Sequence, residues 1–214
     1  MHRTVQPELL DSLPPDHPDA LHNRRDLRLT NLIMGNLRWF VRTLPRLLRP
    51  HELLLEIGAG TGELSRRLAT MGIPTDALDL WPRPAPWPAG RLWHQSDLRT
   101  FDDFAAYPAV IGNLIFHQFS IAELAALGDR MRPHARVILA SEPVRRRLSQ
   151  VLYRFAGPLF RANRISLHDA HVSIAAGFRD HELPSALGLE QKDWNIHCCT
   201  TALGAYRLIA VRRP

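Results

Sequence analysis

The sequence has few cysteines, almost no lysine and no long apolar run. Its two cysteines, Cys198 and Cys199, are neighbours, which excludes a disulfide framework and fits a reducing compartment. No stretch reaches the ~18 consecutive apolar residues of a membrane-spanning helix. The first residues, rich in proline and acids, have no apolar core of the kind that a secretory signal needs. We therefore expect a cytoplasmic protein.

Lysine is nearly absent, because Lys192 is the one lysine among 27 basic residues. Against 21 acidic residues, the basic residues give a formal net charge of +6. A surface that binds nucleic acid needs basic residues in clusters, often with interleaved aromatic side chains. The bulk charge therefore does not by itself indicate a nucleic-acid partner.

The order of elements predicts one α/β domain with a helical leader. Residues 1–19 are expected to be a loose lead-in. Apolar residues then recur three and four apart up to Leu48, which predicts a helix that Pro45 kinks and Pro50 ends. We place the leader at residues 1–49 and the main domain at 50–214.

Short apolar strands alternate with helices in the main domain, which predicts a mostly parallel sheet covered on both faces. A helical insert at 143–186 interrupts the alternation, and two strands joined by a turn at Gly204 end the chain as a hairpin. The hairpin would place an antiparallel strand in the sheet. The predicted strands are 53–57, 75–80, 92–95, 109–116, 137–140, 193–200 and 206–211, and the predicted helices are 63–71, 100–106 and 121–131.

A glycine-rich turn, Gly58-Ala59-Gly60-Thr61-Gly62, joins the first strand to a helix. Such a turn lets a ligand approach the backbone at a helix N-terminus. Glu63 stands where a dinucleotide-binding fingerprint has its third glycine, which disfavours a pyrophosphate ligand and a nicotinamide-dependent oxidoreductase. Asp79, at the end of the second strand, is placed to accept both hydroxyls of a ribose.

The segment from Leu54 to Gly62 resembles motif I of the class I S-adenosylmethionine-dependent methyltransferases. The resemblance continues in order over roughly residues 50–214. The segment Leu78-Asp79-Leu80 is similar to the ribose-binding acidic motif, and Ser96-Asp97-Leu98 is similar to the adenine-contacting segment. Residues 113–119 resemble the Asn-Leu-x-x-His-His-Phe motif of small-molecule methyltransferases, and residues 132–137 resemble the turn into the fifth strand.

This resemblance implies a Rossmann-like seven-stranded sheet of order 3-2-1-4-5-7-6, with strand 7 antiparallel, N-terminal helices and a helical cap insert. It implies S-adenosyl-L-methionine as the cofactor, with no metal. Glu56 would reach the methionine amino group, Asp79 the ribose and Asp97 the adenine amino group. The expected cofactor-binding residues are Glu56, Gly58, Ala59, Gly60, Gly62, Asp79, Leu80, Asp97, Leu98, Asn113 and Leu114.

Two histidines are the candidate catalytic bases. His117 follows the fourth strand, at the edge where ligands of open α/β sheets collect, and His168 lies in the cap insert. The leader at 23–36 and parts of the insert resemble bacterial methyltransferases of polyketide- or quinone-type biosynthesis. We therefore expect a small, largely apolar, hydroxylated acceptor, phenolic or polyketide-like, with O-methylation favoured over C-methylation.

The insert contains a helical stripe flanked by arginines, which leaves several interpretations open. The stripe could line an apolar pocket as a lid, lie on an anionic membrane surface to collect a lipid-like substrate, contact nucleic acid, or form an ordinary solvated face. The apolar residues of the stripe are Leu148, Val151, Leu152, Phe155 and Leu159.

Two other functions remain open alternatives. An RNA methyltransferase would use the arginine-rich charge, although the Asn-Pro-Pro-Tyr type motif of base N-methylation is missing. A non-catalytic, cofactor-binding partner of another enzyme would bind the cofactor without methylating an acceptor. The sequence does not predict the oligomeric state.

Overall fold

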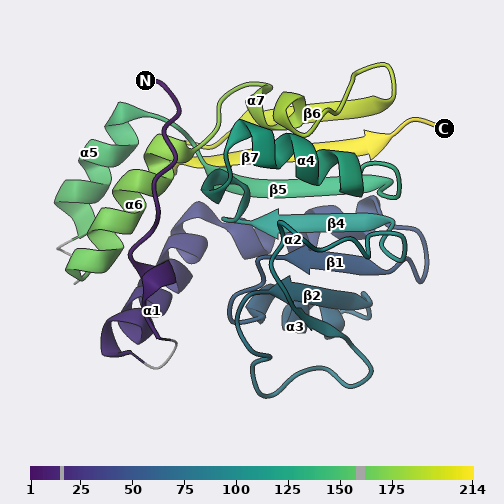
Figure 1. Ribbon diagram of the computed structural model, residues 1–214, viewed down its shortest axis with the longest axis horizontal. Coiled ribbons are helices and arrows are strands. Elements are labelled where there is room, and N and C mark those ends of the chain that lie inside the picture. The colour runs from purple at the N-terminus through teal and green to yellow at the C-terminus, as the bar shows by residue number, and fades with distance from the viewer. Residues whose placement is uncertain (15–16, 158–161) are drawn as a thin grey trace.

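A computed structural model describes residues 1–14, 17–157 and 162–214. Its seven strands form one sheet in the order β3-β2-β1-β4-β5-β7-β6 (Figure 1). Strand β7 is antiparallel to β5 and β6, and the other neighbouring strands are parallel. The predicted fold class is therefore confirmed. The strands are β1 Leu54–Ile57, β2 Thr75–Asp79, β3 Trp93–Gln95, β4 Ala109–Asn113, β5 Val137–Pro143, β6 Trp194–Thr200 and β7 Ala205–Arg212.

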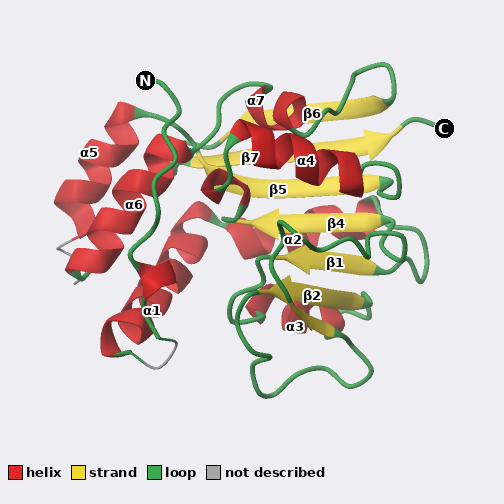
Figure 2. Cartoon of the chain, in the orientation of Figure 1, coloured by secondary structure: helices red, strands yellow, loops and turns green. Residues whose placement is uncertain are grey.

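Helices cover both faces of the sheet, which explains why its central strands are almost continuously apolar. One core cluster joins the sheet to α4 and α7, and the other joins the opposite face to α2 and α3 (Figure 2). Helices α5 and α6 pack on each other beside the strand ends and form the predicted insert. The helices are α1 Pro18–Met34, α2 Asn36–Thr43, α3 Glu63–Ala69, α4 Ile121–Met131, α5 Arg147–Ala156, α6 Arg164–Ala176 and α7 Glu182–Ala186.

The leader contains two helices where the apolar spacing predicts one. Gly35 adopts a left-handed conformation with φ of 66°, which ends α1 and begins α2. Pro45 lies in a short 3-10 helix after α2, so the chain leaves the helix where proline predicts. Among the described residues, no helix has both the length and the apolar character needed to cross a membrane.

Two further expectations differ from the structure. The segment 100–106 forms loop and turns instead of a helix, with the N–H groups of Thr100 and Phe101 bonded to the Asp97 carbonyl. Pro108 follows directly, and a proline disfavours the helical conformation of the residue before it. The lead-in is also ordered where it is described, since residues 1–13 lie along α6 and make hydrogen bonds to it. Of the predicted stripe in the insert, Leu159 lies outside the described residues.

Candidate functional site

A cavity of about 790 Å³ opens at the carboxyl ends of β1, β2 and β4. This edge is where open α/β sheets bind ligands, and the volume suits a ligand of several hundred daltons. The glycine loop and the strand ends form one wall, and α1, α5 and α6 form the other. The predicted residues that line it are Glu56, Gly58, Ala59, Gly60, Asp79, Leu80, Asp97, Leu98, Asn113, Leu114 and His117, whereas Gly62 and His168 do not.

The glycine loop has all three glycines in the left-handed region. A Cβ on Gly58 would come within 2.5 Å of Ile115, and one on Gly62 within 2.6 Å of Trp87, so both glycines are required by packing. Gly60 has nothing within 4 Å of its Cβ position and faces the cavity. Gly60 is therefore the point at which a ligand can touch bare backbone.

Asp79 holds the loop closed. One of its carboxylate oxygens accepts the Gly60 N–H at 2.7 Å and the other accepts the Trp81 N–H at 2.9 Å. Each oxygen keeps a second lone pair, so two ligand hydroxyls can still bind. Burial raises the pKa of Asp79, and the two backbone N–H donors oppose that shift.

Arg24 of α1 is a site residue that the sequence did not reveal. Its guanidinium lies 3.8 Å from the centre of the Trp81 ring, beside Asp79, and it lines the cavity. Its buried Nη2 has no hydrogen-bond partner among the described residues. A buried donor without a partner is costly, so this atom marks a place for a ligand acceptor. No local sequence signal places a leader arginine over the second strand.

Glu56 lies under the glycine loop. One carboxylate oxygen accepts hydrogen bonds from both the backbone N–H, at 2.9 Å, and the hydroxyl of Ser65 in α3. Burial raises the pKa of Glu56 to about 7, although the Ser65 donors oppose the shift. Glu56 also lines the cavity, so a ligand amino group can approach its carboxylate.

Asn113 takes part in a series of side-chain hydrogen bonds that joins the leader to the sheet. Its Nδ2 donates to Asn31 at 3.0 Å, Asn36 donates to the same Asn31 oxygen, and Ser141 donates to Asn36. The Asn113 Oδ1 is buried and has no partner among the described residues. The Asn113 oxygen therefore can accept a hydrogen bond from a ligand.

Asp97 lines the cavity beyond the end of β3. Its Oδ1 accepts the Arg99 N–H at 2.8 Å, and its side chain is 38% exposed. The carboxylate can therefore accept a hydrogen bond from a ligand amino group, as the sequence predicts. Leu98, Leu114 and Leu80 add apolar surface to the same region.

His117 lies between two carboxylates and is buried. Its Nδ1 is 2.6 Å from Glu142, and its Nε2 is 3.1 Å from Glu8. Because an ionised carboxylate only accepts, both ring nitrogens donate and the ring is an imidazolium. Burial lowers the pKa of His117, but the charges and hydrogen bonds of Glu142 and Glu8 outweigh this and raise it to about 10. An imidazolium held in this way has no free lone pair with which to take a proton.

Glu142 organises the turn that carries His117. Its carboxylate accepts the backbone N–H groups of Ile115 and Phe116, each at 2.9 Å, and of His117 at 3.2 Å. Its side chain is fully buried at the end of β5. The turn into the 3-10 helix after β4 is therefore built around this carboxylate.

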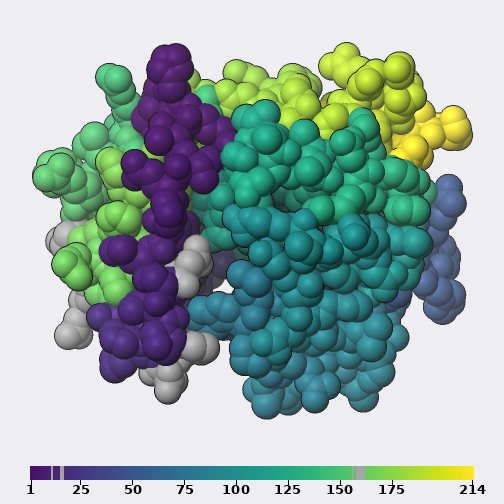
Figure 3. Space-filling model, viewed as in Figure 1, coloured from purple at the N-terminus to yellow at the C-terminus, as the bar shows by residue number. Residues whose placement is uncertain are grey.

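Glu8 belongs to an N-terminal strap, which we define as residues 1–13. In Figure 3 this purple segment crosses the green helices of the cap. Arg3 donates to the backbone oxygens of Ala176 and Phe119, at 2.8 and 2.7 Å. Asp169 of α6 accepts the N–H groups of Leu9 and Leu10, at 2.8 and 3.1 Å. The strap thus fixes Glu8 in the cavity wall.

Three carboxylates line the part of the cavity that lies under the cap: Glu8, Asp26 and Asp169. Asp26 accepts the hydroxyl of Ser166 at 2.6 Å. Burial raises the pKa of Glu8, but the hydrogen bonds and charge of His117 prevail and the pKa is lowered. Glu8 therefore stays ionised near neutral pH.

His168 faces away from the cavity. Its side chain is 42% exposed, and its Nδ1 lies 3.1 Å from Asp169. The predicted helical insert does contain His168, on α6, but the side chain is on the exposed side of that helix. Glu8, Arg24 and Asp26 are cavity-lining groups that the sequence analysis did not predict, and Glu142, behind His117, is another group that it did not predict.

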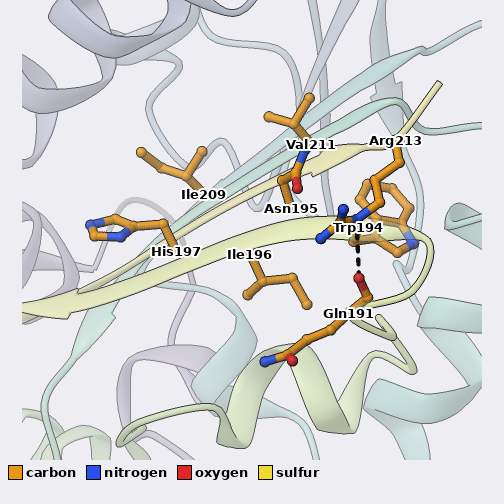
Figure 4. Close-up of a pocket in the computed structure, with 8 residues that line it drawn as sticks. All are labelled: Gln191, Trp194, Asn195, Ile196, His197, Ile209, Val211 and Arg213. Carbon is orange, nitrogen blue, oxygen red and sulfur yellow. Dashed lines mark hydrogen bonds between the residues drawn. The ribbon is translucent and has the colours of Figure 1, made fainter.

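A second, shallow depression of about 340 Å³ lies on the edge strand β6 and its neighbour β7 (Figure 4). The figure shows Arg213 donating to the Gln191 carbonyl, at 3.1 Å, next to Trp194. None of the predicted site residues lines it. Within the described residues, no group of three or more His, Cys, Asp or Glu side chains is placed to hold a metal ion.

Solved structures with the same arrangement include several methyltransferases. The plantazolicin methyltransferase BpumL, in complex with a triazolic desmethylPZN analog and S-adenosylhomocysteine, has a TM-score of 0.72 at 11% identity, over 96% of this chain and 93% of that one. Magnesium protoporphyrin IX methyltransferase (ChlM) from Synechocystis PCC 6803, with bound S-adenosylhomocysteine, has a TM-score of 0.55 at 17% identity, over 86% and 83%.

A structure described as "Conversion of a Disulfide Bond into a Thioacetal Group during Echinomycin Biosynthesis" has a TM-score of 0.59 at 16% identity, over 83% of this chain and 81% of that one. Neither a protein-family model nor a curated protein sequence matches this chain. At these identities the likeness establishes the fold alone. The chain has the fold of the methyltransferases that bind S-adenosylmethionine and S-adenosylhomocysteine.

Proposed function

We propose that the protein is an S-adenosylmethionine-dependent methyltransferase that acts on a small, largely apolar, hydroxylated acceptor. The observation that carries the proposal is the combination at one cavity edge of the bare backbone of Gly60 with Asp79 and Asp97. These groups suit an adenosine, because Asp79 can accept two ribose hydroxyls and Asp97 an adenine amino hydrogen. Gly60, Asp79 and Asp97 also lie near the carboxyl ends of the strands, where open α/β sheets bind their ligands.

The fit extends to the methionine half of the cofactor. Glu56 and Asn113 can accept from an ammonium group, and Arg24 can donate to cofactor oxygens; the Asn113 Oδ1 and the Arg24 Nη2 have no partner in the part of the chain that the structure describes. When bound, the cofactor supplies a methyl group activated by a sulfonium. The residues of the chain bind and orient it, exclude water and position the acceptor in line, which suffices for much of the rate enhancement.

The acceptor would occupy the remaining volume under α5 and α6. Glu8 is ionised there and can accept the hydrogen of an acceptor hydroxyl, which strengthens the oxygen as a nucleophile. His117 would hold Glu8 in place as an imidazolium and not act as the base. His168 has no part in this scheme because it is exposed outside the cavity. O-methylation is favoured over C-methylation on this basis.

A second candidate acceptor is an amine. Three carboxylates, Glu8, Asp26 and Asp169, line the acceptor part of the cavity and would stabilise a cation there. N-methylation of a largely apolar amine uses the same cofactor site. The hydroxylated acceptor and the amine acceptor would differ only in the group, a hydroxyl or an amine, that contacts Glu8.

The test is transfer of a labelled methyl group from S-adenosylmethionine to matched phenols and amines of equal size, with release of S-adenosylhomocysteine as a second readout. Turnover of a phenol supports the proposal, and turnover of the amines alone selects the second candidate. Cofactor binding without transfer to any acceptor indicates a non-catalytic partner protein. Steeply salt-dependent RNA binding with RNA methylation would contradict a small-molecule acceptor.

A further inference from the structure

Helix α5 exposes an apolar stripe that the rest of the described chain leaves uncovered. Leu148, Val151, Leu152 and Phe155 are 65%, 50%, 58% and 72% exposed. Their spacing of three and four residues places them on one face of the helix. Tyr153 attaches the helix to the leader through Thr30, so the stripe is presented on a packed element. A contiguous exposed apolar patch of this kind marks an interaction site.

The surroundings of the stripe are positively charged. Arg146, Arg147 and Arg154 are exposed on or beside α5. The sequence contains no acidic residue between Glu142 and Asp169, so no carboxylate of this segment offsets these arginines. We call the stripe together with Arg147 and Arg154 the α5 surface. An apolar face edged by arginine fits an anionic lipid interface, where burial and electrostatic attraction add.

The cavity opens beside the α5 surface. Leu152, Ile33 and Leu203 each line the cavity and are also 58%, 42% and 63% exposed. The turn with Leu203 adjoins the helix, since a Cβ on Gly204 would lie 3.9 Å from the Ser149 hydroxyl. Figure 1 shows α5 and α6 at the edge of the molecule, beyond the carboxyl ends of the strands. The mouth of the cavity therefore has an apolar rim continuous with the stripe.

We propose that the α5 surface docks on an anionic lipid membrane, with the mouth of the cavity turned toward the bilayer. Docking is separate from the proposed function, because it requires neither cofactor nor acceptor. A second copy of the chain fits the surface less well than lipid does. A two-fold contact through this surface would bring the arginines of both copies together, which repels.

The experiment is co-sedimentation of the full chain with phosphatidylcholine vesicles that contain phosphatidylglycerol, and with vesicles of phosphatidylcholine alone. We expect binding to the anionic vesicles that is at least roughly tenfold stronger and that weakens as salt rises. The double variant Leu152→Ser, Phe155→Ser should lose binding by on the order of tenfold. Ile121→Ser, on the 53% exposed side chain of α4, is the matched apolar control and should bind as the wild type does.

The charge contribution has its own pair of variants. Arg147→Glu should weaken binding to anionic vesicles by roughly fivefold or more, whereas Arg67→Glu, the same change at an exposed position of α3, should have little effect. All these side chains are exposed, so circular dichroism should confirm folded variants. The proposal would be overturned if the wild-type protein did not bind anionic vesicles, or if the α5 variants bound them as strongly as the wild type does. A dimer in light scattering that Phe155→Ser dissociates, without lipid binding, would instead assign the surface to a second copy.

Discussion

The Nε2 of His117 lies 3.1 Å from the carboxylate of Glu8, so the N-terminal strap and the end of the sheet meet inside the cavity wall. The contact spans 109 positions of sequence and continues to Glu142 on the other ring nitrogen. Both carboxylates accept from the ring, which keeps it charged. The histidine is therefore a buried cation that holds Glu8, which lines the cavity together with Asp26 and Asp169.

Stability should fall as the pH rises from neutral to alkaline. The folded-state pKa of His117 is about 10, above its unfolded value of ~6.5. Above the unfolded pKa the unfolded chain has released a proton that the folded chain retains, so the free energy of unfolding drops by up to ~1.4 kcal/mol per pH unit. Urea unfolding at pH 7, 8 and 9 measures this slope, and the stabilisation is fully present below the unfolded pKa.

His117→Gln is the control for that slope, because glutamine does not titrate. The variant should be less stable at pH 7, and its free energy of unfolding should change less between pH 7 and 9. Identical slopes for the variant and the wild type would show that His117 is not the group held protonated by Glu8 and Glu142.

Arg24→Ala should weaken binding of S-adenosylhomocysteine by roughly tenfold, because a charge-assisted hydrogen bond contributes ~1.5–3 kcal/mol. The motivating feature is the buried Nη2 that lacks a partner among the described residues beside Asp79. Arg25→Ala, the exposed neighbour on the same helix, is the matched control. Calorimetric titration of both variants decides the matter, and equal affinities would remove Arg24 from the cofactor site.

Asp169→Asn should loosen the strap. The aspartate accepts the N–H groups of Leu9 and Leu10 and the amide of Asn23, and hydrogen bonds to a charged acceptor are worth about 1.5–3 kcal/mol. Hydrogen exchange at these two backbone amides should accelerate by on the order of tenfold or more. Asp129→Asn, whose side chain is 67% exposed, should leave exchange in the strap unchanged. Unchanged protection in Asp169→Asn would mean that other contacts hold the strap.

Gly60→Ala and Gly72→Ala distinguish the effect of backbone strain on stability from the effect of a new side chain on ligand binding. Both glycines have a left-handed φ, 55° and 75°, and neither has any atom within 4 Å of its Cβ position. Each substitution should cost about 1 kcal/mol of stability. Only Gly60 lines the cavity, so only Gly60→Ala should abolish binding of S-adenosylhomocysteine. Loss of binding in both variants, or in neither, would contradict the role given to Gly60.

The local features of the fold were predictable because they depend on neighbouring residues. Buried strands read as short apolar runs, and the positive φ of Gly58, Gly60 and Gly62 follows from a tight strand-to-helix turn. Asp79 ends β2, so its place at the carboxyl edge follows from the strand alone. The part of the cavity beside the glycine loop was therefore predictable, because strand ends and one tight turn supply most of its residues.

The part of the cavity under α5 and α6 was not predictable because its contacts are long-range. Glu8 meets His117 and Asp169 meets Leu9 across more than a hundred residues, and nothing in the proline-rich lead-in signals this packing. His168 lies in the predicted insert but on an exposed face of α6, because its position in a helical segment does not determine which way its side chain points. The helix predicted at 100–106 is replaced by loop and turns, and Tyr107, which precedes Pro108, is held by a hydrogen bond from its hydroxyl to Asp76 of β2.

Binding of S-adenosylmethionine at the cavity edge through Asp79 can be measured with the product of methyl transfer. Calorimetric titration of the folded wild type with S-adenosylhomocysteine should give saturable one-to-one binding, and Asp79→Asn should weaken it by roughly tenfold, the loss expected for a ribose hydrogen bond worth ~1.4 kcal/mol. No heat from folded wild-type protein at millimolar ligand, or an unchanged affinity in Asp79→Asn, would contradict the account.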